Sequence, residues 1–331
     1  MTAALPAEVI DQACRAFGIG PASQTRPGGG TAGSNVELHT PAGHFFLRSR
    51  SAEHADLDEI RYDHALLAEL AKEHLPVQPP RTTTAGETFC VLADRIVELF
   101  DWVDGKPFVP GCREHLADTG RQLARLHAAT AHRTARKDKP WEQQPDFLAA
   151  ELDRLTASLD TAGHENLLAA VRQELQRLGR TLAGPVIKSL PAAVVHGDFH
   201  PGNALFAGGK LAGLFDWDWA NYQHRATDLC DAVFFFARQP DDFSGDDIWA
   251  MTCGPRIDPA AAAILLDAYQ AVTPIAPVER ELLNDFLAAR WLQERIRGMR
   301  KVPIERRLEF LNRGDLLNVL DHLKGRGDQV I

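Results

Sequence analysis

The hydrophobic pattern of this chain changes its period near residue 103, and this change limits the fold more than any other feature. Before it, NVELHT and HFFLRSR alternate apolar and polar residues around a short turn, which predicts a β-hairpin. ETFCVL and RIVELFDWV predict two more strands, and residues 56–73 have the spacing of an amphipathic helix. The first part should therefore form an antiparallel sheet of at least four strands with one inserted helix.

From about residue 113 onward, apolar residues recur mainly at helical spacing. Short strands are expected to interrupt this pattern only at 192–216, and a further helix is expected near the start, at 7–17. We therefore predict an α+β fold with a β-rich N-lobe at residues 1–103 and a helical C-lobe at 104–331.

Composition excludes several classes of protein. The 331 residues are 45 % hydrophobic and 24 % charged, which is typical of a globular protein, and no apolar run reaches the length of a membrane span. The start lacks a basic segment before an apolar one, so no signal peptide is expected. Five scattered cysteines favour reduced thiols and a cytoplasmic protein. A net charge of −9 argues against non-specific nucleic-acid binding.

The segment AAVVHGDFHPGNALF, residues 192–206, carries an unusual density of polar residues between two apolar runs. His196 and His200 stand four residues apart, the spacing at which a helix can place two histidines on one zinc ion. Gly197 and Pro201 oppose a helix here, so a zinc pair is not favoured.

Asp198, Asn203 and Asp216 form a better set. ALF and LAGLF are expected to pair as a hairpin around AGGK, which brings Asn203 and Asp216 to one end. A carboxylate and an amide oxygen suit Mg²⁺ that holds phosphate oxygens, and Asp198 would then accept a proton from an attacking hydroxyl. This constellation indicates phosphoryl transfer.

HGDFHPGN followed by LFDWD resembles the active-site signature of the aminoglycoside phosphotransferase and choline-kinase-like family, which includes homoserine-kinase-like members. The resemblance implies a bilobal protein-kinase-like fold with ATP and Mg²⁺ as cofactors. It implies Asp198 as catalytic base and Asn203 and Asp216 as metal ligands. Asp218 matches a second acidic position, and Asp228 matches a residue that holds the loop structurally.

The N-lobe extends the resemblance, and "GGGTAGSNVELHTPAGHFFLRS" is similar to the family's glycine loop and third strand. The implied nucleotide-binding residues are Gly29, Gly30, Ser34, Asn35, Arg48, Asp63 and the backbone from Glu98 to Phe100. Arg48 stands where many kinase-like proteins have lysine, and Asp63, with Glu59 as competitor, stands where its helix partner is usually glutamate. His196, His200 and Trp219 are expected to support the loop or contact the substrate.

The sequence therefore predicts an ATP-dependent kinase that phosphorylates a hydroxyl group of a small molecule and acts as a monomer or homodimer. Homoserine or an amino alcohol, a sugar and an aminoglycoside remain open as acceptors, with a lean toward the homoserine-kinase-like members. One alternative is a metal-dependent phosphoesterase that uses His196, Asp198, His200 and Asn203. Another is a catalytically silent nucleotide-binding protein. A protein kinase is disfavoured because LFDWD leads almost directly to Asp228.

Overall fold

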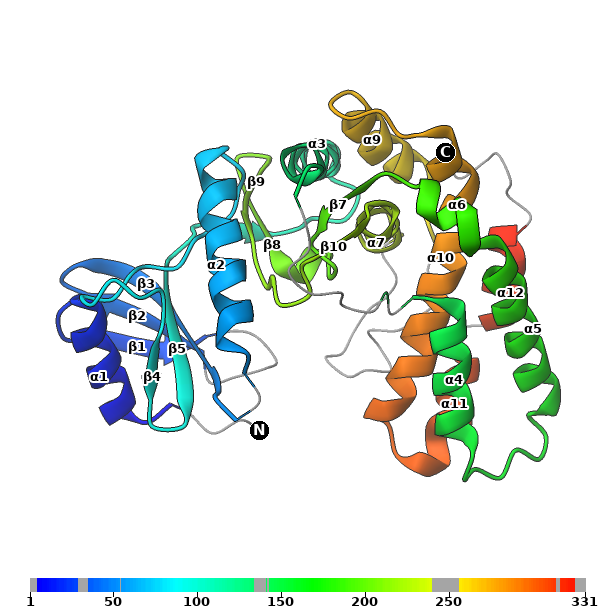
Figure 1. Cartoon of the computed structure of the whole chain (residues 1–331), viewed down its shortest axis with the longest axis horizontal. Helices are drawn as coiled ribbons and strands as arrows, with labels where there is room; N and C mark the ends of the chain where they lie inside the picture. The colour runs from blue at the N-terminus through cyan, green and yellow to red at the C-terminus, as the bar shows by residue number, and fades with distance from the viewer. Residues whose placement is uncertain are drawn as a thin grey trace. The chain divides into compact units, whose positions relative to one another are not determined.

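The computed structural model describes residues 5–28, 35–53, 55–133, 141, 143–239, 256–313 and 316–324. Internal contacts divide the chain into two compact units (Figure 1). The first, here called the N-terminal unit, comprises residues 1–106, 205–207 and 212–218. The second, here called the helical unit, comprises residues 107–204, 208–211 and 219–331. The short segment 212–218 brings two acidic residues of the LFDWD motif into the N-terminal unit.

The N-terminal unit is built on a five-stranded antiparallel sheet in the order β1-β2-β3-β5-β4. Its strands are β1 (Gln24–Pro27), β2 (Val36–Thr40), β3 (Gly43–Ser51), β4 (Cys90–Leu92) and β5 (Arg95–Asp101). The predicted hairpin is β2 and β3, and the predicted strand pair is β4 and β5. Strand β1 was not predicted, because its four residues, QTRP, are all exposed and show no apolar alternation.

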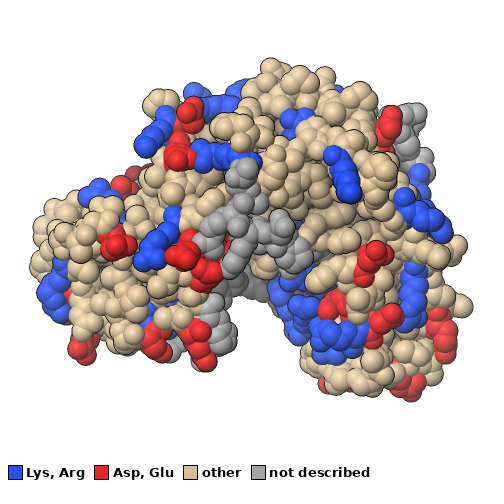
Figure 2. All heavy atoms as spheres, viewed as in Figure 1, with Lys and Arg blue, Asp and Glu red and all other residues tan. Residues whose placement is uncertain are grey.

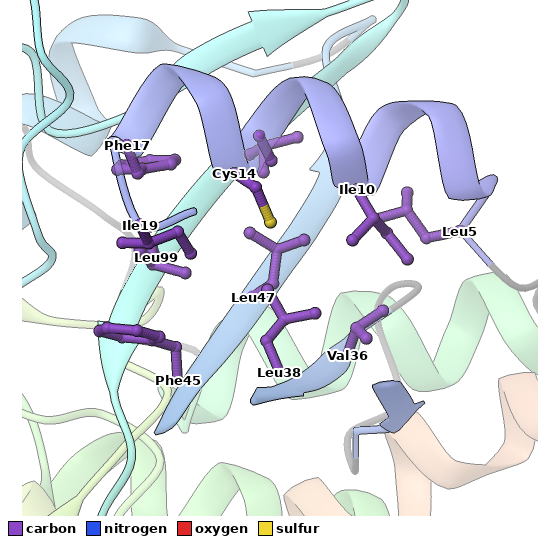
Figure 3. Close-up of a cluster of buried hydrophobic side chains, with 12 residues drawn as sticks. Leu5, Ile10, Cys14, Phe17, Ile19, Val36, Leu38, Phe45, Leu47 and Leu99 are labelled. Carbon is purple, nitrogen blue, oxygen red and sulfur yellow. The ribbon is translucent and has the colours of Figure 1, made fainter. Parts of the chain in front are cut away.

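Helix α1 (Ala7–Phe17) covers one face of this sheet. Figure 3 shows Ile10, Cys14 and Phe17 of the helix directed at Leu38 and Leu47 of the strands, and all five side chains are buried. Alternate residues of each strand point to this core, so the intervening residues lie on the opposite face. Helix α2 (Leu57–Lys72) follows β3, and the Asp56 side chain caps it by accepting the N–H groups of Asp58 and Glu59.

The helical unit is assembled around α10 (Pro277–Gly298), most of which is buried. Helices α4, α5, α7, α11 and α12 contact it, and α3 packs against α9. The described α-helices of this unit other than α10 are α3 (Arg113–Thr130), α4 (Pro145–Thr156), α5 (Glu165–Thr181), α6 (Gly184–Ser189), α7 (Ala226–Phe236), α9 (Pro259–Gln270), α11 (Arg307–Asn312) and α12 (Leu316–Lys324). The α3–α9 crossing needs Gly120, since a Cβ there would lie 2.1 Å from the Leu265 carbonyl oxygen.

Short strands carry the polar segment singled out above. Strand β7 (Ala192–Val195) pairs with β10 (Asn221–His224), and β8 (Ala204–Ala207) lies between β6 (Lys106–Pro107) and β9 (Lys210–Leu214). The predicted β8–β9 hairpin is confirmed. The expectation that strands occur only at 192–216 in this part was wrong, because NYQH has no apolar alternation and becomes a strand by pairing with the buried β7.

None of the helices within the described ranges is both long enough and apolar enough to cross a membrane. Figure 2 shows basic and acidic side chains mixed on the face that it presents.

His224 gives the fold a pH dependence that can be measured. Its ring is buried beside Trp141 and Phe286, and burial lowers the pKa of the imidazole to about 4. The unfolded chain therefore binds this proton between about pH 6.5 and 4 while the folded chain does not, so the stability supplied by neutral His224 is lost as the pH falls. We expect His224→Phe to remove up to about 3 kcal/mol of this acid-induced loss.

Chemical denaturation of the wild type and His224→Phe at pH 7 and pH 4 measures the effect. His164→Phe is the matched control, because His164 is only half-buried, and it should keep the wild-type difference between the two pH values. Equal pH dependence of the wild type and His224→Phe would contradict the assignment.

Candidate active site

The loop that carries Asp198 is held from behind by the buried carboxylate of Asp228. Oδ2 of Asp228 accepts the backbone N–H of His196 at 2.7 Å, and Oδ1 of Asp228 accepts the backbone N–H of Gly197 at 3.0 Å. Nε2 of His127 lies 3.3 Å from the same Oδ2, and its Nδ1 lies 2.8 Å from the Tyr269 hydroxyl. Three helices, α3, α7 and α9, therefore fix the backbone just before Asp198.

The local sequence is adapted to this loop. Gly197 has φ +79°, and a Cβ there would lie 2.5 Å from the Trp219 carbonyl oxygen, so only glycine fits. Nδ1 of the buried His196 accepts the backbone N–H of Asp198 at 3.3 Å. The two residues before Asp198 thus set its position through backbone geometry.

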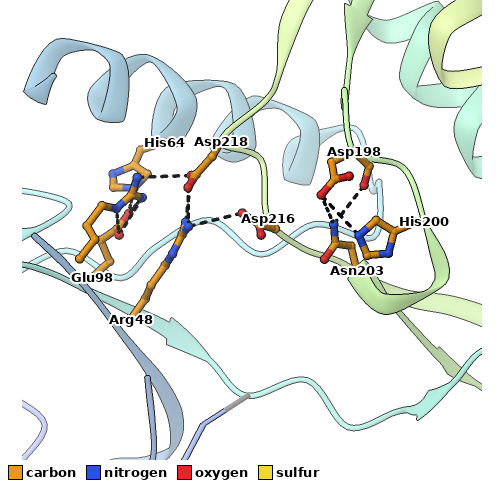
Figure 4. Close-up of polar contacts among 9 residues, drawn as sticks. Arg48, His64, Glu98, Asp198, His200, Asn203, Asp216 and Asp218 are labelled. Atoms are coloured by element: carbon orange, nitrogen blue, oxygen red, sulfur yellow. Dashed lines mark hydrogen bonds and ion pairs between the residues drawn. The ribbon is translucent and has the colours of Figure 1, made fainter. Parts of the chain in front are cut away.

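The Asp198 side chain is 30 % exposed and has two neighbours in the helical unit (Figure 4). Asn203 Nδ2 donates to the Asp198 carbonyl oxygen at 3.0 Å and to its Oδ2 at 3.3 Å. His200 Nδ1 accepts the N–H of Gly202, which places the ring proton on Nε2, 3.4 Å from Asp198 Oδ2. Burial opposes ionisation of Asp198, but His200 and the charge of Arg290 outweigh it and lower the pKa of the carboxyl.

Behind His200 lies a buried cation. Arg290 of α10 places Nε 2.8 Å from Asp231 Oδ1, and its guanidinium stacks over the Phe235 ring at 4.9 Å. The His200 ring lies against the same Phe235, with ring centroids 5.6 Å apart. Burial raises the pKa of Asp231 to about 7, although Arg290 opposes this. Arg290, Phe235 and His200 form a continuous packed path toward Asp198.

The second group of polar residues lies in the N-terminal unit (Figure 4). Arg48 of β3 donates to Asp218 through two nitrogens, at 2.6 and 3.1 Å, and lies 3.4 Å from Asp216 Oδ1. Asp216 follows β9 in the left-handed region at φ +63°, which a non-glycine residue seldom adopts. The N–H of Leu214 donates to the Pro76 carbonyl at 2.8 Å and holds the end of β9.

Glu98 of β5 is the buried centre of this group. Arg50 donates to its two oxygens at 2.9 and 2.8 Å, and His64 Nε2 lies 2.7 Å from Oε1. Nδ1 of His64 lies 2.7 Å from the Thr88 hydroxyl, and Arg50 also reaches Asp218 at 3.3 Å. Burial opposes ionisation of Glu98, but His64 and the charges of Arg50 and Arg48 lower its pKa.

The predicted nucleotide-binding residues are placed only in part. Gly29, Gly30 and Ser34 lie outside the described residues. Asn35 directly precedes β2, and its carbonyl accepts the N–H of Gly28 at 2.7 Å, which closes the base of the predicted glycine loop.

The predicted helix and hinge residues lie on α2 and β5. Helix α2 places His64 against Glu98 and buries Asp63, and the pairing of Asp63 with Arg48 stays a prediction. Glu98 to Phe100 lie inside β5, paired with β3, and the Leu99 carbonyl already accepts the Arg81 N–H. The Trp219 side chain is exposed, 5.9 Å from the Arg297 guanidinium.

Sequence reasoning missed four charged or titratable residues of these groups: Arg50, His64, Asp231 and Arg290. Arg50 had a readable signal, because it stands two residues after Arg48 and must share its face of β3. Asp231 also had a readable signal, because it stands three residues after Asp228, nearly one helical turn along, and so lies close to it on the same helix. Arg290 had no readable signal, since it comes from a helix without a recognisable motif.

Three comparisons place the chain among known proteins. The family model described as "Phosphotransferase enzyme family" matches residues 23–265. A homoserine kinase from Afipia carboxidovorans is 30 % identical over 288 residues, which cover 83 % of this chain and 78 % of that protein. A homoserine kinase from Nitrobacter winogradskyi is 28 % identical over 284 residues, with the same coverage of both chains.

Solved structures share the fold. An amicoumacin kinase in complex with AMP-PNP and Ca²⁺ has a TM-score of 0.70 at 15 % identity, covering 98 % of this chain and 94 % of that one. A microcompartment-associated aminopropanol kinase has a TM-score of 0.67 at 15 % identity, covering 98 % of this chain and all of that one. The predicted α+β kinase-like fold class is confirmed.

Glu98→Gln tests the buried centre of the N-terminal unit. The substitution keeps the size of the side chain but removes the charge that Arg50 and His64 face, and breaking a buried ion pair from one side costs about 3–5 kcal/mol. We expect a loss of that size in the free energy of unfolding, measured by urea denaturation. Glu87→Gln is the control: Glu87 is exposed and 3.9 Å from Arg61, so its loss should cost under about 1 kcal/mol. Equal stability of the two variants would contradict the arrangement.

Proposed function

The chain belongs to the phosphotransferase enzyme family, and from this premise we propose that it transfers the terminal phosphate of Mg·ATP to the hydroxyl group of homoserine. It is a small-molecule kinase that phosphorylates a hydroxyl group. The resemblance inferred from HGDFHPGN and LFDWD is confirmed. The acceptor, the metal and the roles of individual residues are our proposal.

The observation that carries the proposal is the state of Asp198. Its backbone is fixed through Asp228, its side chain is partly exposed, and its pKa is lowered, so the carboxylate is ionised at neutral pH. In the proposed step the acceptor oxygen forms a bond to the γ-phosphorus while the bond from that phosphorus to the ADP oxygen breaks. The hydroxyl proton passes to the Asp198 carboxylate, which also orients the attacking oxygen.

Asn203 and Asp216 are the proposed Mg²⁺ ligands. Both supply the oxygen donors that Mg²⁺ prefers. Both hydrogen bonds from Asn203 to Asp198 use Nδ2, so the Asp198 contacts do not use the amide oxygen Oδ1. A metal held by these two residues would offset the negative charge that develops during transfer.

Arg48 and Arg50 are the proposed phosphate contacts. Both guanidinium groups are gathered on one face of β3, and Asp218 holds Arg48 through a two-nitrogen fork, the geometry in which arginine also binds phosphate. Asp216 and Asp218 pair with these cations in the structure. If Asp216 held the metal, Arg48 would be available to contact the phosphates.

The phosphoesterase alternative has less support from the loop geometry. Nδ1 of His196 accepts the Asp198 N–H, and Nδ1 of His200 accepts the Gly202 N–H. Both rings therefore brace the loop, which favours Asp198 and Asn203 over the histidines as the chemical groups.

Homoserine is proposed as acceptor because the two relatives described above, similar over most of their length, are homoserine kinases. We expect ADP formation in a coupled assay to depend on L-homoserine, with kcat/KM at least about tenfold above that for 1-amino-2-propanol or an aminoglycoside. A preference for either of the other two acceptors would overturn homoserine but keep the kinase assignment. ADP formation that needs no acceptor would overturn the transfer reaction.

Asp198→Asn tests the base. General-base assistance contributes about 10²–10⁴-fold, so kcat should fall by that factor while ATP affinity, measured by calorimetry, stays within about twofold. Asp153→Asn, on the exposed face of α4, is the matched control and should retain wild-type activity. Full activity of Asp198→Asn would exclude it as the base.

A further inference from the structure

A second group of metal-ligand side chains lies on the β2–β3 hairpin, apart from the residues discussed above. Glu37 and His39 are two residues apart on β2, and His44 is the cross-strand partner of His39 on β3. Leu38, Phe45 and Leu47 point to the core under α1, so these three polar side chains share the opposite face of the sheet (Figure 3).

Three ligand atoms converge at this place. Nε2 of His39 and Nε2 of His44 each lie 3.1 Å from Oε1 of Glu37, and all three atoms lie within 4.8 Å of one another. Two ligands of a tetrahedral zinc ion with bonds of 2.0–2.1 Å are about 3.3 Å apart. Both Glu–His separations are therefore already close to the spacing that such an ion requires.

The backbone holds these side chains in place before any ion arrives. The turn between the strands is two residues long, and the Thr40 side chain accepts the Ala42 N–H within it. The His44 ring stacks on the Trp102 ring, with ring centroids 4.3 Å apart, and the backbone N–H of Trp102 donates to the backbone carbonyl of His44. These contacts restrict the hairpin and the His44 ring, which lowers the conformational entropy lost on binding.

We propose that Glu37, His39 and His44 bind one divalent transition-metal ion of the zinc class, with solvent completing the coordination. The side chains are 16 %, 36 % and 29 % exposed, so an ion can reach them from solution. Two imidazoles and one carboxylate suit Zn²⁺, Co²⁺ or Ni²⁺ and disfavour Mg²⁺, which prefers oxygen ligands. The site lies on the face of β3 that also carries Arg48 and Arg50, but none of its three ligands is among the residues proposed for phosphoryl transfer.

Binding requires two local adjustments. The rings of His39 and His44 are stacked with planes 19° apart and must turn about their Cβ–Cγ bonds so that both Nε2 lone pairs meet the ion. Each ring must carry its proton on Nδ1, not on Nε2. Arg26, 3.9 Å from Glu37 and largely exposed, can swing away from the incoming cation.

The bound ion would clamp β2 to β3, and because the unfolded chain lacks the site, it would stabilise the fold. Calorimetric titration of the full chain with Zn²⁺, and with Mg²⁺ for comparison, tests this. We expect the wild type to bind one Zn²⁺ per chain. In His39→Ala/His44→Ala the Zn²⁺ affinity should fall by at least about 100-fold, since losing an outer partner of a metal ligand already costs about 10–100-fold in affinity. Zn²⁺ should raise Tm in the wild type but not in His39→Ala/His44→Ala.

His132→Ala/His164→Ala, which changes two histidines of the helical unit, should bind Zn²⁺ like the wild type. Glu37→Gln keeps both imidazoles, and its Zn²⁺ affinity should fall by at least about tenfold. This variant provides the test if the double variant fails to fold. Equal Zn²⁺ affinity in the wild type and either cluster variant would overturn the proposal, because the three groups would then be only a hydrogen-bonded cluster.

Discussion

The buried carboxylate of Asp228 is the interaction on which the candidate active site depends most. It receives two consecutive backbone N–H groups, those of the buried His196 and the partly buried Gly197. Without Asp228 the buried donor would be unsatisfied, at a cost of about 1–3 kcal/mol. The positive φ of Gly197 and the acceptor ring of His196 then carry this fixed geometry to Asp198. A loop that looks irregular in sequence is therefore rigid, as positioning a hydroxyl for in-line transfer requires.

Charge balance links the structure of the N-terminal unit to the proposed reaction. Arg48 and Arg50 face three carboxylates, those of Glu98, Asp216 and Asp218, so the carboxylates exceed the guanidinium groups by one. The Glu98 side chain is fully buried and paired with Arg50 and His64, whereas the Asp216 side chain is 44 % exposed. The excess would be offset most readily at Asp216, by a divalent cation. Two arginines on one face of β3 would then be available for the phosphates that accompany such an ion.

The sequence predicted local features well and long-range polar contacts poorly. The β2–β3 hairpin follows from apolar alternation, and α1 from Pro6, which precedes it, and Gly18, which ends it with φ +65°. The Asp198 and Asn203 loop is likewise contained in one short motif. The link from His64 to Glu98 depends on the rotation of α2 about its axis, which no short motif encodes.

Two further features lay beyond local patterns for related reasons. Arg290 reaches Asp231 across 59 residues of chain, and no local pattern encodes that approach. Strand β10 exists only because β7 offers it a partner, so its own sequence gave no strand signal.

Phosphorus NMR of the products tests the central claim most directly, because it shows where the phosphate goes. Wild-type protein with Mg·ATP and L-homoserine should convert the three ATP resonances into those of ADP and one new phosphomonoester, coupled to the methylene protons of the acceptor carbon that bore the hydroxyl. A spectrum with ADP and inorganic phosphate alone, or with unchanged ATP, would contradict phosphoryl transfer to that hydroxyl.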